Sequence, residues 1–102
     1  MKLALHENIK ELRLQSGLNQ VEFSKKMNVT KQCVSNWEND NVLPSIEMLA
    51  KIADYFCVTT DYLLGRSTED VINVNGLTAE QMAHIRLLVK DFLELNQKEN
   101  SK

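Results

Sequence analysis

Residues 30–39 place polar side chains on one side of a predicted helix, and none of them is a carboxylate. The opposite side carries Val34 and Trp37, which lie three residues apart and define an inward face. The polar face consists of Lys31, Gln32, Ser35, Asn36 and Asn39. Surface helices normally mix Glu with Lys, so we interpret this face as one that supplies hydrogen-bond donors to a partner rich in acceptors.

The charged residues support this interpretation only when they are counted segment by segment along the chain. The 102-residue chain has 12 Lys or Arg against 14 Asp or Glu, a net charge of −2, which as a bulk number argues against a nucleic-acid partner. Residues 1–66 hold eight of each sign, and the excess of acid lies in residues 67–102. Between Phe23 and Trp37 there are three Lys and no acid. Taken alone, these lysines could equally be an ordinary solvated face.

The residues expected of a catalytic or metal site are missing from the sequence pattern. Cys33 and Cys57 form no CxxC pair, and neither His6 nor His84 has a companion at catalytic or zinc-binding spacing. Three Gly residues are too few and too scattered for a nucleotide cradle. We therefore predict a protein that is not an enzyme, with no metal and no cofactor. Cys57 lies among apolar neighbours, so we expect it to be a core residue.

Targeting and membrane signals are also missing. The apolar run that begins the chain is interrupted after four residues, which is too short for a signal peptide. No stretch approaches the ~18 apolar residues that a membrane span requires. These observations predict a cytoplasmic protein with no membrane partner.

Helical periodicity and turn residues divide the first part of the chain into five short helices. Three of them are predicted over residues 3–15, 20–27 and 30–39, a fourth opens at Ser45, and a short fifth ends at Gly65. Asn19 and Glu22 have the spacing of a capping box. Asn28 falls in a connection of about three residues, where we expect a positive φ.

The fold class predicted is all-α, in three parts. Residues 1–66 form the five-helix domain, residues 67–76 form a polar linker in which Val71, Ile72 and Val74 favour a short extended segment, and residues 77–102 contain a C-terminal helix. A second capping box, Thr78 with Gln81, opens that helix, which we expect to reach about residue 96.

Over about residues 5–65 the chain resembles the Cro/CI-like, XRE-type helix-turn-helix repressors. The resemblance rests on spaced features: G-L-N-Q opening the second helix, N-V-T at the turn, V-S-N-W-E in the third helix, P-S before the fourth and D-Y-L-L-G at the close. It implies a lambda-repressor-like domain whose third helix enters the major groove of double-stranded DNA. Ser24 and Asn28 stand where the family usually has Ala and Gly.

The resemblance also assigns roles to individual side chains. Base contacts fall on Lys31, Gln32 and Asn36, with Ser35 and Cys33 as secondary candidates; Lys can donate to guanine, and Gln or Asn can pair bidentately with adenine. Phosphate contacts fall on Gln20, Asn19 and Asn39. A structural salt bridge is implied between Arg13 and Glu38. The loop 39–42 lacks the cations that many relatives carry, which predicts a shallow salt dependence of DNA binding.

The C-terminal helix carries an apolar stripe that must be covered. Met82, Ile85, Val89 and Phe92 step by three and four residues, and Leu88 and Leu95 widen the stripe to one side. We predict that these residues form a homodimer interface, which implies a palindromic operator. The alternative is a helix that folds back on the first domain.

Two functions compete at this point. The first is a sequence-specific DNA-binding transcriptional regulator, a repressor acting as a homodimer. The second is an antitoxin or partner-controlled regulator whose C-terminal helix binds another protein.

Overall fold

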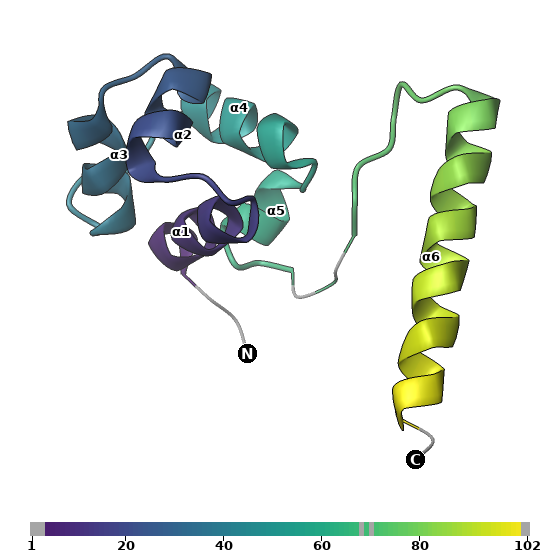
Figure 1. The fold of residues 1–102 in the computed structure, drawn as a ribbon. Coiled ribbons are helices and arrows are strands. Elements are labelled where there is room, and N and C mark those ends of the chain that lie inside the picture. The colour runs from purple at the N-terminus through teal and green to yellow at the C-terminus, as the bar shows by residue number, and fades with distance from the viewer. Residues whose placement is uncertain (1–3, 68, 70, 101–102) are drawn as a thin grey trace.

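The computed structural model describes residues 4–67, 69 and 71–100, and within them it contains six α-helices and no strand (Figure 1). The helices are α1 (Leu5–Gln15), α2 (Gln20–Met27), α3 (Lys31–Glu38), α4 (Ile46–Phe56), α5 (Thr60–Leu63) and α6 (Ala79–Asn100). The all-α class is therefore confirmed, and α2 has the predicted bounds. The structure extends α6 four residues beyond the predicted end.

One core joins the first five helices, because each contributes at least one buried apolar side chain to it. The buried residues are Ile9, Phe23, Met27, Val34, Trp37, Ile52, Ala53 and Leu63. The ring centroids of Phe23 and Phe56 lie 5.3 Å apart, which packs α2 against the end of α4. Asn8 is buried among these residues, and its side-chain amide donates to the carbonyls of Tyr62 and Leu63 at 3.1 Å each. These two bonds satisfy the hydrogens of the buried amide and tie α1 to α5.

Local sequence signals start and stop these helices. The Asn19 side chain accepts from the Glu22 amide at 2.7 Å, and the Glu22 carboxylate accepts from the Asn19 amide at 2.9 Å, as a capping box requires. Ser45 caps α4 by accepting from the Met48 amide at 3.1 Å, without the reciprocal bond of a capping box. Asn28 has φ 59°, so the expected left-handed residue ends α2 and turns the chain sharply toward α3.

The expectation that Cys57 is a core residue is wrong. Cys57 ends α4 in a left-handed conformation with φ 57°, and its side chain is exposed. Its apolar neighbours Phe56 and Val58 occupy the two inward positions on either side of this turn and pack against the core. Their hydrophobicity made the whole segment look buried, although only two of its three residues are directed inward.

The segment between α5 and α6 makes a backbone hydrogen bond to the residue that ends α4. Asn73 donates its amide hydrogen to the carbonyl oxygen of Cys57 at 2.9 Å, next to the exposed Val71 and Ile72. These residues form no strand, so the β-favouring composition does not lead to sheet pairing here. Positions 68 and 70 of the predicted linker lie outside the described residues.

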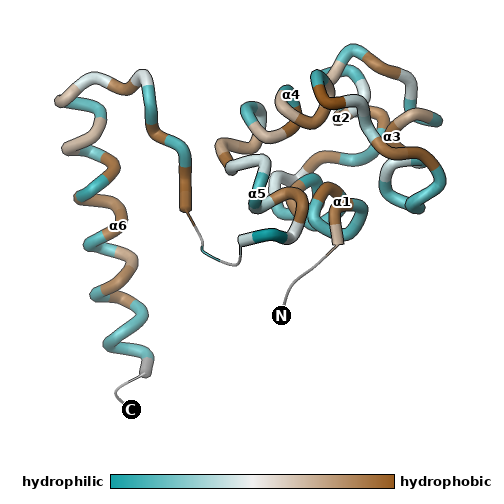
Figure 2. Tube along the Cα trace, turned by 180° about the vertical axis from the view of Figure 1, so that it is seen from behind, coloured by the Kyte–Doolittle hydropathy of each residue, from teal (hydrophilic) through white to brown (hydrophobic). Residues whose placement is uncertain are grey.

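Helix α6 lies beside the five-helix unit (Figures 1 and 2). Its large apolar side chains are exposed to solvent. Those exposed are Ile85, Leu87, Leu88, Val89, Phe92, Leu93 and Leu95. Phe92, for example, is 61% exposed. The helix therefore does not take the folded-back arrangement that was the alternative for its apolar stripe.

No helix in the described part of the chain combines the length and the apolar character needed to cross a bilayer. No group of three or more His, Cys, Asp or Glu residues within the described ranges is arranged to hold a metal ion.

Candidate nucleic-acid interface

The polar face predicted around residues 31–39 is present on α3 and points away from the core. Val34 and Trp37 are 0% and 3% exposed, which fixes the rotation of the helix about its own axis. The five polar residues lie on the opposite side; Lys31, Gln32 and Asn39 are exposed, and Ser35 and Asn36 are half-buried. The first turn of α3 contains no acidic residue. The face thus offers one cation and several neutral donors to the solvent.

Four of these polar side chains are paired along the helix. Gln32 donates its side-chain amide hydrogen to Asn36 Oδ1 at 3.0 Å, and Asn39 donates to Ser35 Oγ at 3.1 Å. Residues four apart are neighbours on a helix surface, so the spacing permits both bonds. The two pairs were not predicted from the sequence, although the i, i+4 spacing could have indicated them.

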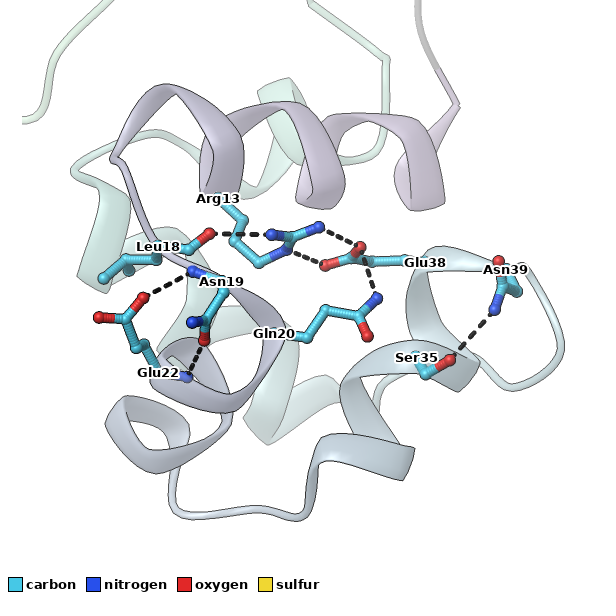
Figure 3. A network of polar contacts seen from close by, with 8 residues as sticks. All are labelled: Arg13, Leu18, Asn19, Gln20, Glu22, Ser35, Glu38 and Asn39. Carbon is cyan, nitrogen blue, oxygen red and sulfur yellow. Dashed lines mark hydrogen bonds and ion pairs between the residues drawn. The ribbon is translucent and has the colours of Figure 1, made fainter.

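A buried ion pair fixes the end of α3 against α1 (Figure 3). Arg13 donates to both oxygens of Glu38, from Nε to Oε2 at 2.6 Å and from Nη2 to Oε1 at 2.9 Å. The side chains are 7% and 2% exposed. The hydrogen bond to Glu38 raises the pKa of Arg13, so the guanidinium stays charged. Arg13 Nη1 also donates to the Leu18 carbonyl at 2.8 Å, which ties in the segment before α2.

Gln20, expected to reach a phosphate, joins this same network. Its Nε2 donates to Glu38 Oε1 at 3.1 Å, and the residue is half-buried at the start of α2 (Figure 3). One amide hydrogen of Gln20 is therefore used inside the protein and the second is available to a ligand. Asn19, the other expected phosphate contact from this segment, is exposed but uses its Oδ1 to cap α2.

The remaining cations near α3 differ in how they are used. Lys25 and Lys26 are exposed in the last turn of α2. Lys51 donates from Nζ to the Met27 carbonyl at 2.7 Å, so this lysine of α4 satisfies a carbonyl at the end of α2. This role of Lys51 could not be predicted from the sequence, because the contact joins residues 24 positions apart.

The loop that follows α3 carries no cation and turns on a strained residue. Asp40 has φ 59°, in the left-handed region. The Asn41 amide donates to the Asn36 carbonyl at 2.9 Å, which closes the turn at the end of α3. Lys25, Lys26 and Lys31 therefore supply the cations of this part of the site, and Asp40 places one carboxylate in the loop.

Comparison with known proteins places this geometry in a family. Residues 9–63 match the Helix-turn-helix family, the segment that runs from the middle of α1 to the end of α5. The chain belongs to this family and, within it, to the XRE type of transcriptional regulator. Its family and its relatives are regulators and not enzymes, so the prediction of a non-enzyme is confirmed.

Two curated relatives share the segment. The HTH-type transcriptional regulator ImmR of Bacillus subtilis (strain 168) is 36% identical over 64 residues, which cover 63% of this chain and 50% of ImmR. The HTH-type transcriptional activator BcrR of Enterococcus faecalis is 31% identical over 72 residues, which cover 71% of this chain and 34% of BcrR. The chain thus spans half or less of these relatives' own lengths.

Two solved structures match nearly the whole chain. A transcriptional regulator from Listeria innocua superposes with a TM-score of 0.59 at 26% identity, over 93% of this chain and 97% of that one. The SinR protein/SinI protein complex contains a chain with a TM-score of 0.54 at 21% identity, over 96% of this chain and 99% of that one. At that identity the second match shows the fold alone.

Proposed function

We propose that this protein is a sequence-specific DNA-binding transcriptional regulator, a repressor that binds a palindromic operator in the cytoplasm as a homodimer. The observation that carries the proposal is the carboxylate-free donor face of α3, held in place by the buried Arg13–Glu38 pair. A rigid helix with outward donors suits the major groove, where base edges present acceptors in a pattern that differs between base pairs.

The proposed contacts divide by chemistry. Lys31 and the amides of Gln32 and Asn36 read base edges, with Ser35 next to them. Gln20, Asn19 and Asn39 contact phosphates and set the orientation of the domain on the duplex. The homodimer is proposed from the uncovered apolar stripe of α6, because a two-fold pair would bring two recognition helices about 34 Å apart, one turn of DNA.

Selection from random duplex DNA tests the proposal. The full chain is incubated with the library at low and at physiological salt, and bound duplexes are sequenced. We expect an inverted-repeat motif, and we expect the substitution Lys31→Ala with Asn36→Ala to change it. Enrichment of no motif, or the same motif from the double variant, would refute sequence-specific binding. A reporter gene placed behind the selected site then measures the direction of regulation, for which we expect repression.

A second candidate function is supported by the same α6 surface. An exposed apolar helix face can bind a different protein, in which case the chain is an antitoxin or a regulator controlled by a partner. Co-purification from the native host, followed by deletion of residues 77–102, separates the two. A stable heteromeric partner lost on deletion favours this second function, whereas a clean homodimer favours the first.

A further inference from the structure

The bond between Gln32 and Asn36 changes what the α3 face can recognise. Gln32 Nε2 donates to Asn36 Oδ1 at 3.0 Å, so the two amides form one unit on the exposed side of the helix. After this bond Asn36 retains both hydrogens of Nδ2 and one lone pair of Oδ1. Asn36 is half-buried and Gln32 is exposed, so the asparagine is the more constrained of the two side chains.

The bond also fixes which side of the asparagine amide carries oxygen. An unpaired amide can turn by half a rotation and exchange its donor for its acceptor. In this pair such a turn would bring the hydrogens of Asn36 against those of Gln32, unless both amides turned together. Before any ligand arrives, the orientation of the Asn36 amide is therefore coupled to that of Gln32, because Asn36 cannot turn alone without losing the bond.

We propose that Gln32 is a positioning residue that holds the Asn36 amide for a single adenine of the operator. One hydrogen of Asn36 Nδ2 and the remaining lone pair of Oδ1 match the adenine edge in the major groove, where N7 accepts and the N6 amino group donates. Gln32 acts on this base through Asn36. This inference rests on the proposed DNA-binding function and specifies the base class read by that site.

The pairing makes a prediction that independent contacts do not make. If both side chains read bases separately, their removal relaxes two different positions of the motif and the effects multiply. If Gln32 acts through Asn36, both removals relax the same position. A neutral hydrogen bond contributes enough to shift a preference roughly fivefold, which is the loss we expect from removing Gln32.

The experiment compares four variants of the full chain by selection from random duplex DNA. They are Gln32→Ala, Gln32→Glu, Asn36→Ala and the double Gln32→Ala, Asn36→Ala. We expect Asn36→Ala to abolish the adenine preference at one position, Gln32→Ala to reduce it roughly fivefold at that same position, and the double variant to match Asn36→Ala. Gln32→Glu keeps the length of the side chain but can only accept, so it should hold the Asn36 amide in the turned orientation and reduce the preference at least as much as Gln32→Ala does.

Two controls keep the outcome interpretable. Gln97→Ala removes an exposed glutamine from α6, far along the chain from α3, and should leave the motif unchanged. Thermal unfolding of each variant shows that it is folded, and the motif is compared only between folded proteins. The added charge of Gln32→Glu weakens binding to every sequence alike, so the preference at one position remains the readout.

Relaxation of two different positions, or a double variant that loses more than Asn36→Ala alone, would overturn the positioning role while leaving DNA binding intact. Enrichment of no motif by the unaltered protein would instead refute the proposed function, and the positioning role with it.

Discussion

The side-chain amide of Gln20 donates to Glu38 Oε1, the same oxygen that receives a hydrogen bond from Arg13. One carboxylate therefore joins α1, the start of α2 and the end of α3. The network connects a residue expected at the phosphate backbone with the residues that fix the recognition helix. Changes at Gln20 should consequently affect both stability and DNA binding, and changes at Glu38 should affect stability first.

Replacing Glu38 by Ala should destabilise the domain by about 3–5 kcal/mol, because it leaves the Arg13 guanidinium buried without its partner. The free energy of unfolding from urea denaturation measures this. The raised pKa of Arg13 means that the stabilisation is retained below its ordinary pKa and is lost only as the pH rises through the raised value. The difference in unfolding free energy between the unaltered protein and Glu38→Ala should therefore be constant between about pH 7 and pH 10.

The matched variant for this pair is Arg13→Ala, which leaves a buried carboxylate instead. We expect a loss of similar size from it, and a double variant less destabilised than the sum of the two singles. Glu38→Ala protein that is folded at low temperature should select the same DNA motif as the unaltered chain. A changed motif would mean that Glu38 contacts DNA directly.

Replacing Gln20 by Ala should cost less, about 1 kcal/mol of unfolding free energy, because a single hydrogen bond of a half-buried amide is lost. Affinity should fall equally for the selected duplex and for a scrambled one, as expected of a phosphate contact. Gln20→Glu is the sharper comparison, since it places a second carboxylate against Glu38 and should destabilise the domain more than Ala does. A Gln20→Ala protein that loses affinity only for the selected sequence would contradict the phosphate role.

Adding a cation to the loop after α3 should steepen the salt dependence of DNA binding. Asn41→Lys places a positive charge in a loop that has no cation, so the slope of log affinity against log salt should increase by about 0.9 for each protomer that gains a phosphate contact. Asn75→Lys adds the same charge to the exposed segment before α6 and should leave the slope unchanged. Equal slopes for both variants would place the 39–42 loop away from the duplex.

Replacing Cys57 by Gly should stabilise the protein by up to about 1 kcal/mol, because Gly adopts the left-handed conformation without the steric cost that a Cβ carries. The thiol is exposed, so little packing is lost. Asn28→Gly, at nearly the same φ, should give a smaller gain, since Asn already tolerates this region. The melting temperatures of the two variants provide the comparison, and destabilisation by Cys57→Gly would show that the thiol contributes packing.

The features that could be predicted from sequence are those encoded within a few residues. Asn28 ends α2 and Ser45 caps α4 because their own side chains or backbone preferences suffice. Cys57 was mispredicted because hydrophobic neighbours do not determine which residue of a turn faces outward. The Gln20–Glu38 bond joins residues 18 apart in sequence, and its geometry exists only once α2 and α3 are packed.

The apolar stripe of α6 provides the most direct test of the proposed homodimer. Met82, Ile85, Val89 and Phe92 define one side of a 22-residue helix, and all but the half-buried Met82 are exposed in the single chain. A charge placed in a packed helix seam must be desolvated without a partner, which opposes association. We therefore expect Val89→Asp to convert a dimer to a monomer, measured by sedimentation equilibrium.

Leu87→Asp is the matched control, because Leu87 is equally apolar and 59% exposed but lies off the stripe. It should leave the dimer intact. A monomer still binds a half-site through α3, so Val89→Asp should lose the inverted-repeat character of the selected motif while retaining the half-site sequence. If both variants are monomers, the dimer interface on α6 extends beyond this stripe. If both remain dimers, the interface lies elsewhere on the chain.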